Sequence, residues 1–199
     1  QSKLVTCHLG SGCSLAAVAG GRSIATTMGY TPLDGLVMAT RSGAVDPGLL
    51  TSLLAEHRLT LPELENALYH QSGLKGVSGC SGDMRQILAA RATGNIRAAL
   101  AFDLYVARLR EGIGAMAAAL AGIDALVFTG GVGENTPEVR AAACGAFACI
   151  GLALDAAANI AATPDAVVST PESAVRVVVL HTREELMVAR ETVRVLRAS

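Results

Sequence analysis

Two glycine-rich stretches follow apolar runs directly, and backbone N–H groups in such stretches can wrap an anion. The first covers residues 10–14 and follows an apolar run over 4–9; the second covers 130–133 and follows 124–129. Glycine permits positive φ and close backbone approach, so successive N–H groups can converge on a phosphate. Taken alone, each stretch is equally compatible with a tight turn that binds nothing. Two of them together favour a nucleotide site, in which we expect Gly133 to need positive φ.

Neither stretch matches the most common phosphate-binding patterns. No G-x-x-x-x-G-K-[ST] sequence occurs in the chain, which argues against a P-loop. The second stretch lacks the last glycine of G-x-G-x-x-G, because Thr136 stands at that position. A dinucleotide-binding oxidoreductase is therefore disfavoured.

Two charged side chains have the chemistry to act on a phosphoryl group. Arg41 lies in a T-R-S-G segment. It is either an ordinary surface residue or a planar fork that grips phosphoryl or carboxylate oxygens. Glu184 and Glu185 open the last predicted helix. We assign Glu185 to a T-x-x-E capping box with Thr182, which leaves Glu184 free to hold Mg²⁺ directly or through water.

The composition indicates a folded domain and argues against several classes of function. Of 199 residues, 51% are hydrophobic and 17% charged, which is not the composition of a disordered chain. The net charge is −1 and no Lys/Arg block occurs, so nucleic-acid binding is disfavoured. The five cysteines form no C-x-x-C pair, which is typical of reduced, buried thiols in a cytoplasmic protein. We expect no membrane span and no signal peptide.

The pattern along the chain predicts an α/β domain. Strands over residues 4–9, 14–19 and 22–27 form an antiparallel meander with a Gly-Gly turn. Capping signals then predict helices over about 47–57 and 60–70. A short helix over 83–91 and a long one over about 96–120 follow. Residues 73–82, rich in glycine and serine, are expected to be a loop. Buried strands over 124–129 and 175–180 each lead into a helix, so a mixed sheet flanked by helices is expected.

The longest predicted helix has one apolar stripe, which we interpret as core packing rather than a cofactor site. Its members recur at steps of three and four and are Phe102, Val106, Leu109, Ile113, Met116 and Leu120. Gly112 and Gly114 let another backbone come close to this helix.

Five segments, in this order and at these spacings, resemble the C-terminal half of the acetate kinase (acetokinase) family. They are CHLGSGCSLAAV, MGYTPLDGLVMATRSGAVDP, SGCSGDMR, DALVFTGGVGENTPEVR and HTREELMVARET. The resemblance implies an RNase-H-like fold of the actin, Hsp70 and sugar-kinase superfamily, in which two domains enclose an ATP cleft. It implies a kinase that transfers the γ-phosphoryl group of ATP to acetate, reversibly and with Mg²⁺.

The resemblance also implies roles for individual residues. Residues 8–12 match the family's H-L-G-N-G loop, 83–85 its D-[ML]-R segment and 131–135 its G-[IV]-G-E-N segment. The nucleotide-binding residues implied are His8, Leu9, Gly10, Ser11, Gly12, Asp83, Met84, Arg85, Gly131, Val132, Gly133, Glu134 and Asn135. Arg41 matches the catalytic arginine that stabilises the transferring phosphoryl group, and Glu184 matches the Mg²⁺ ligand.

Two residues depart from the family pattern, and half of that pattern has no counterpart. Ser11 and Arg183 stand where the family usually has Asn. The family's N-terminal half, which carries the carboxylate site, has no match in this chain, so acetate and propionate both stay open as substrates. We expect residues 1–185 to form the nucleotide-binding domain and residues 186–199 a helix that packs on the N-terminal half.

The resemblance further implies a cytoplasmic homodimer, and we expect the chain alone to be inactive. The alternative is a truncated nucleotide-binding and dimerisation module that turns nothing over. A sugar kinase or a chaperone-like ATPase of the same superfamily is disfavoured, because T-R-S-G and G-V-G-E-N occur together.

Overall fold

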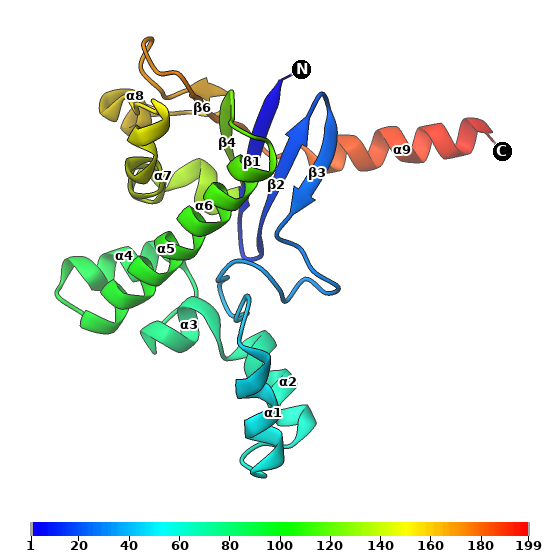
Figure 1. The fold of residues 1–199 in the computed structure, drawn as a ribbon, viewed down its shortest axis with the longest axis vertical. Helices are drawn as coiled ribbons and strands as arrows, with labels where there is room; N and C mark the ends of the chain where they lie inside the picture. The colour runs from blue at the N-terminus through cyan, green and yellow to red at the C-terminus, as the bar shows by residue number, and fades with distance from the viewer. Residues whose placement is uncertain (1, 199) are drawn as a thin grey trace.

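The computed structural model describes residues 2–198 and forms a six-stranded mixed sheet (Figure 1). The strands are β1 (Lys3–Leu9), β2 (Cys13–Ala19), β3 (Arg22–Thr26), β4 (Ala125–Thr129), β5 (Ala166–Val167) and β6 (Arg176–Val179). Their order is β3-β2-β1-β4-β6-β5. The predicted meander pairs antiparallel, β4 is parallel to both β1 and β6, and β5 adds an antiparallel edge. The α/β class is confirmed.

Helices fill the connections between these strands. They are α1 (Pro47–Ala55), α2 (Leu61–His70), α3 (Gly73–Ser78), α4 (Met84–Ala92), α5 (Ile96–Ala119), α6 (Gly130–Asn135), α7 (Pro137–Cys144), the 3₁₀ helix η1 (Gly145–Ile150), α8 (Ala156–Ala161) and α9 (Glu184–Ala198). Local signals set several starts: Asp46 accepts a hydrogen bond from the Leu49 N–H, and Thr60 forms a capping box with Glu63.

Two glycine-rich segments that we did not predict to be helices are helical. Residues 73–78 form α3 because the N–H groups of Leu74 and Lys75 donate to the carbonyls of Met38 and Ala39, at 2.9 and 3.0 Å. Residues 130–135 form α6, whose first N–H, on Gly130, donates to the Glu134 carboxylate at 3.0 Å. Both helices depend on partners that the local glycine content does not reveal.

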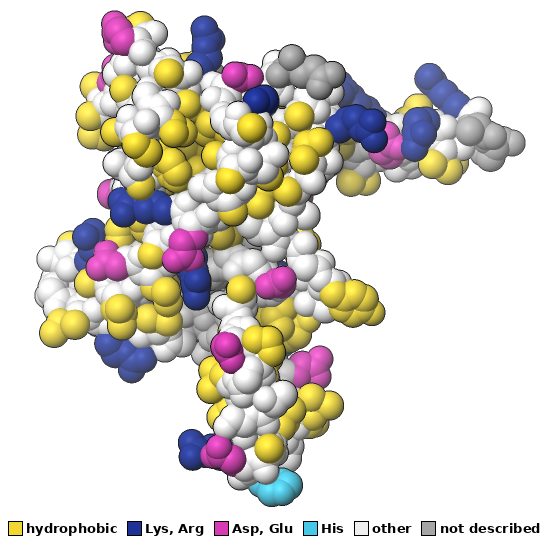
Figure 2. All heavy atoms as spheres, viewed as in Figure 1, with side chains coloured by type: hydrophobic (Ala, Val, Ile, Leu, Met, Phe, Trp, Pro, Cys, Tyr) yellow, Lys and Arg dark blue, Asp and Glu magenta, His cyan; other side chains and the backbone are white. Residues whose placement is uncertain are grey.

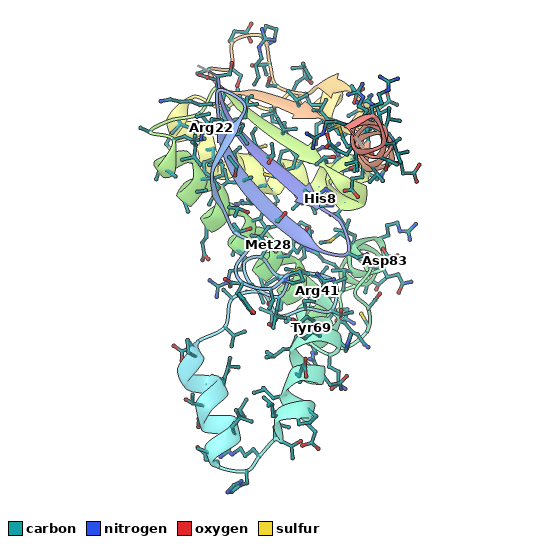
Figure 3. The ribbon with its side chains drawn as sticks, turned by 90° about the vertical axis from the view of Figure 1, so that its right-hand side faces the viewer. His8, Arg22, Met28, Arg41, Tyr69 and Asp83 are labelled. Carbon is teal, nitrogen blue, oxygen red and sulfur yellow. The ribbon has the colours of Figure 1, made fainter. Side chains whose placement is uncertain are left out.

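Two parts of the molecule project from the sheet. The side chains of residues 184–197, in α9, are all exposed, and the helix runs away from the sheet with apolar residues on its surface (Figures 1 and 2). On another side, α1 and α2 form a helical hairpin that projects below the sheet (Figure 3). None of the helices within residues 2–198 combines the length and apolar character that a membrane crossing requires.

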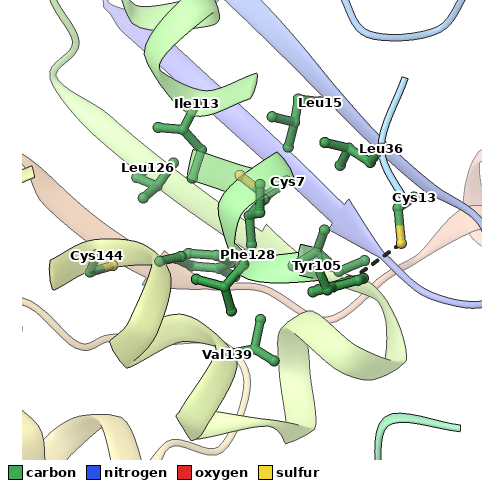
Figure 4. Packing of buried hydrophobic residues seen from close by; sticks show 14 of the residues in the cluster. Cys7, Cys13, Leu15, Leu36, Tyr105, Ile113, Leu126, Phe128, Val139 and Cys144 are labelled. Atoms are coloured by element: carbon green, nitrogen blue, oxygen red, sulfur yellow. Dashed lines mark hydrogen bonds between the residues drawn. The ribbon is translucent and has the colours of Figure 1, made fainter. Parts of the chain in front are cut away.

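The core lies between one face of the sheet and helices that include α5 and α7 (Figure 4). Alternate residues of β1 and β2 are buried there, as a half-covered sheet requires. The predicted stripe of α5 packs against them, from Phe102 to Leu120, which confirms its core role. A Cβ on Gly112 would lie 2.6 Å from Cδ1 of Leu15, so this glycine lets α5 approach β2 closely. Gly114 faces open space.

Candidate functional site

A pocket of about 550 Å³ opens where the β1–β2 turn, α4 and α6 come together. It is lined by Gly10, Ser11, Ala39, Thr40, Leu74, Gly82, Asp83, Met84, Arg85, Tyr105, Gly131, Val132, Asn135 and Thr136. The volume is of the size that small-molecule sites have, and the lining combines backbone groups with a few polar side chains.

All three segments that we predicted to bind a nucleotide contribute to this lining. The predicted residues present there are Gly10, Ser11, Asp83, Met84, Arg85, Gly131, Val132 and Asn135. The predicted residues that do not line it are His8, Leu9, Gly12, Gly133 and Glu134. Leu9, Gly133 and Glu134 are buried in the fold. Gly12 lies beside Arg41, and His8 lies beside Glu184.

The β1–β2 turn is held from inside and from a neighbouring loop. The Gly10 N–H donates to the carbonyl of Gly12 at 3.0 Å, and the Ala39 N–H donates to the carbonyl of Ser11 at 3.2 Å. The Arg41 guanidinium lies against the turn, because a Cβ on Gly12 would be 3.2 Å from its Nη1. Figure 3 shows His8, Arg41 and Asp83 around this end of the hairpin.

The loop that carries Arg41 is fixed by the segment entering α3. The Ser72 N–H donates to the carbonyl of Thr40 at 2.9 Å, beside the two bonds from α3 to Met38 and Ala39. Nη1 of Arg41 itself donates to the carbonyl of Pro32 at 3.1 Å. The guanidinium therefore has a defined position next to the turn and keeps further N–H donors for a ligand.

The start of α4 places two opposite charges on the pocket wall. Asp83 accepts from the Arg85 N–H at 2.9 Å, and the Arg85 guanidinium pairs with the same carboxylate at 2.6 Å. Hydrogen bonds from Arg85 hold the pKa of Asp83 below its usual value. Asp83 is therefore an ionised cap of α4.

Glu134 turns inward from α6 and connects it to the segment before α9. Its Oε1 accepts from the N–H groups of Gly130 and Thr182 and from the Thr182 hydroxyl, each at 3.0 Å; its Oε2 lies 2.8 Å from Nδ1 of His181. Burial alone would raise the pKa of Glu134, but the bonds with His181, Thr182 and Gly130 outweigh it and lower the pKa. The carboxylate is ionised at neutral pH.

Two expectations about these segments are wrong. The capping box between Thr182 and Glu185 does not form, because the Thr182 hydroxyl bonds to Glu134 and, at 2.7 Å, to Thr129. The positive φ that we expected at Gly133 occurs at Gly130, where φ is +78°. The turn out of β4 needs this conformation one residue after the strand, whereas Gly133 lies inside α6.

Glu184 lies at the first turn of α9, beside the end of β1. Its Oε1 is 4.0 Å from Nε2 of His8, and its side chain is 74% exposed. No group of three or more His, Cys, Asp or Glu side chains suited to a metal occurs within residues 2–198. Mg²⁺ keeps several waters and commonly binds one or two carboxylates together with substrate phosphates. A single exposed carboxylate fits that kind of site.

Comparison with known proteins decides the family. The model of the acetokinase family matches residues 1–190. This chain belongs to the acetokinase family. The acetate kinase of Gloeobacter violaceus is 55% identical over 191 residues, which are 96% of this chain and 47% of the relative. That of Nostoc punctiforme is 54% identical over 197 residues, 99% of this chain and 49% of the relative.

Solved structures confirm the fold. The acetate kinase of Porphyromonas gingivalis matches with a TM-score of 0.93 at 42% identity, over 98% of this chain and 49% of that one. The propionate kinase of Francisella tularensis matches with a TM-score of 0.89 at 37% identity, over 96% and 49%. The RNase-H-like architecture that the resemblance implied is thereby confirmed. The acetokinase chain described here spans about half the length of these relatives.

The acetokinase pocket includes residues that the sequence did not single out. They are Ala39, Thr40, Leu74, Gly82, Tyr105 and Thr136. Ala39 and Thr40 adjoin Arg41, so the T-R-S-G segment was a usable signal for them. Tyr105 is 3% exposed and contacts Sγ of Cys13 at 3.4 Å. Its spacing on α5 is that of a core residue, and no sequence signal separates the two roles.

Proposed function

We propose that this chain is the nucleotide-binding half of a carboxylate kinase, which transfers the γ-phosphoryl group of ATP to acetate reversibly. The observation that carries the proposal is the pocket in which the turn at Gly10, the start of α4 and the start of α6 meet. The curated relatives are acetate kinases, and one solved relative is a propionate kinase. Both acetate and propionate are therefore candidate acceptors.

The residues around the pocket suit phosphoryl transfer, which depends on positioning and charge neutralisation more than on covalent help. Ser11 and Val132 line the pocket, and backbone N–H groups near them would meet phosphate oxygens. Arg41, held beside Gly12, would stabilise charge on the transferring phosphoryl group. Bound Mg²⁺ supplies further neutralisation of the phosphate oxygens, and Glu184 would hold it directly or through water. Asp83 and Arg85 would orient the nucleotide at the rim.

The acceptor site and the second wall of the cleft would come from the other half of the protein. We propose that residues 1–185 are the nucleotide-binding domain and that residues 186–199 pack on that half; Gln1 and Ser199 lie outside the described residues. The exposed apolar residues Met187, Val188 and Val193 of α9 support this packing. The chain alone would then leave Arg41 and Glu184 facing water, where their charges are strongly screened, and would be inactive.

We further propose a homodimer that works in the cytoplasm. The apolar stripe of α5 is already buried within the chain, so a partner subunit would meet other residues of this helix. Ile96 and Leu100 are exposed on it, at 84% and 56%, and Gly114 leaves open space. These exposed positions support a contact surface on α5.

The first prediction combines a binding assay with an activity assay. Calorimetry should show ADP binding to the chain with Mg²⁺. A hydroxamate assay should detect no acetyl phosphate from the chain alone, and activity should appear when the N-terminal half of the Gloeobacter violaceus acetate kinase is added. Arg41→Ala should abolish that activity, because a neutral side chain cannot stabilise the phosphoryl group. Arg58→Ala, at an exposed arginine paired with Glu56, should not.

Each alternative result has a definite meaning. Absence of ADP binding contradicts the nucleotide site. Binding without activity after mixing favours a module that binds but does not catalyse. Turnover by the chain alone shows that its cleft is complete.

A further inference from the structure

We infer that Glu134 is a positioning residue, which fixes the segment carrying Glu184 against the start of α6. The inference rests on the proposed function, because it concerns how the nucleotide segment and the metal-binding carboxylate keep their relative positions. It differs from the role that the family resemblance implies for Glu134, which is direct contact with the nucleotide.

The carboxylate of Glu134 points into the fold, and both of its oxygens have hydrogen-bond partners there. Its side chain is 9% exposed, and the residue does not line the pocket. One oxygen accepts three hydrogen bonds and the other contacts Nδ1 of His181. An ionised carboxylate with these partners has little capacity left for a ligand. It would also repel a phosphate rather than attract it.

The partners of Glu134 belong to the ends of two neighbouring strands. Gly130 follows β4, Thr182 follows β6, and these strands pair in parallel. The hydrogen bonds of Glu134 therefore join the two segments that follow the carboxyl ends of β4 and β6. Glu184 is two residues beyond Thr182, at most about 7 Å along the chain. A displacement of Thr182 is thus transmitted to Glu184.

The other end of α6 is held independently. Nη1 of Arg140 donates to the carbonyls of Gly133 and Glu134, both at 2.8 Å, and its Nε donates to Oδ1 of Asn159 at 2.7 Å. Arg140 is 1% exposed. Because Arg140 anchors α6, loss of the Glu134 carboxylate should release the residues around Thr182 more than α6 itself.

Hydrogen exchange of the ligand-free chain tests this release. In Glu134→Ala, we expect amide exchange over residues 177–188 to rise at least about tenfold, because the N–H and hydroxyl donors of Thr182 lose their acceptor. Residues 131–136 should change less. Glu134→Gln keeps an acceptor oxygen and should rescue much of the protection. The matched control is Glu138→Ala, at an exposed glutamate on α7, which should leave both segments unchanged.

Calorimetry with ADP separates positioning from direct contact. We expect Glu134→Ala to reduce the gain in ADP affinity that Mg²⁺ provides by about tenfold, with a smaller change in the affinity measured without Mg²⁺. An equal loss with and without Mg²⁺ overturns the inference in favour of direct contact. Unchanged exchange over 177–188 also overturns it. If Glu134→Ala does not fold, Glu134→Gln decides, since it should shift the same segment by less.

These outcomes are distinguishable from failure of the proposed function. A parent chain that binds no ADP contradicts the nucleotide site, while the exchange measurement still decides whether Glu134 holds the segment before Glu184.

Discussion

The two glycine-rich segments that wall the pocket contain the same residue type for different physical reasons. The β1–β2 turn and the β4–α6 turn lie side by side, since β1 pairs with β4 through His8 and Thr129. At Gly12 the missing side chain leaves room for the Arg41 guanidinium. At Gly130 the backbone itself has positive φ, and a Cβ would lie 2.8 Å from the carbonyl oxygen of Leu9. In the first segment glycine leaves space for a neighbouring side chain. In the second segment glycine is needed for the backbone conformation and for close contact with another strand.

The largest expected effect is at Gly130. Gly130→Ala should lower the free energy of unfolding by about 2 kcal/mol or more, because alanine is strained at positive φ and its Cβ would contact the Leu9 backbone. Urea denaturation measures the change. Gly131→Ala is the control, since nothing lies within 4 Å of its Cβ position, and it should be close to neutral. Equal effects at the two positions would show that the positive φ of Gly130 is not the reason for glycine there.

A smaller effect on stability, but a clear one on function, is expected at Gly12. Gly12→Ala should change the free energy of unfolding by less than about 1 kcal/mol, because only a flexible side chain must move. Moving the Arg41 guanidinium should still reduce the reconstituted hydroxamate activity by about tenfold. Gly145→Ala, at a glycine outside the pocket with nothing within 4 Å of its Cβ position, is the control and should keep full activity. Full activity in Gly12→Ala would show that this glycine does not serve Arg41.

The smallest expected effect is on the reactivity of buried cysteine thiols. Their reaction rates report whether the structure around the two segments opens. Cys13 lies in the first segment, where β2 begins, and Cys144 ends α7, the helix that follows the second segment. Burial raises their pKa values to about 11 and about 12. At pH 8 a disulfide reagent should modify the exposed Cys80 and Cys149 and leave the buried thiols unmodified until the chain unfolds. Rapid reaction of Cys13 or Cys144 in the native chain would show that its segment opens.

Local rules predicted much of the fold. The Gly-Gly hairpin, the capping box at Thr60 and the stripe of α5 each depend on residues close in sequence, and each was found. The helices at 73–78 and 130–135 were missed because their first N–H groups bond to Met38, Ala39 and the Glu134 carboxylate. Met38 and Ala39 are brought to α3 only by the tertiary structure. Glu134 lies four residues after Gly130, but its carboxylate is held in place by His181 and Thr182, which are distant in sequence.

The candidate site was predicted mainly through the order of the motifs. Physical reasoning from types and spacing indicated an anion-binding pair of segments, but it did not bring α4 into the same pocket. It also assigned Thr182 to a helix cap, whereas its hydroxyl joins two strand ends. A hydroxyl group suits either arrangement, so spacing alone could not decide between them.

The position of β1 in the sheet has a consequence for the order in which the chain folds. β1 is made before its parallel neighbour β4, and the Lys3 N–H donates to Asp124, 121 positions later. During synthesis at about 5–20 residues per second, this strand waits roughly 6–24 s for its parallel neighbour. Throughout that interval the meander of β1, β2 and β3 has an unpaired strand edge, and α5 is completed before that edge is covered. One of the two central strands of the finished sheet is therefore an edge strand until β4 has been made.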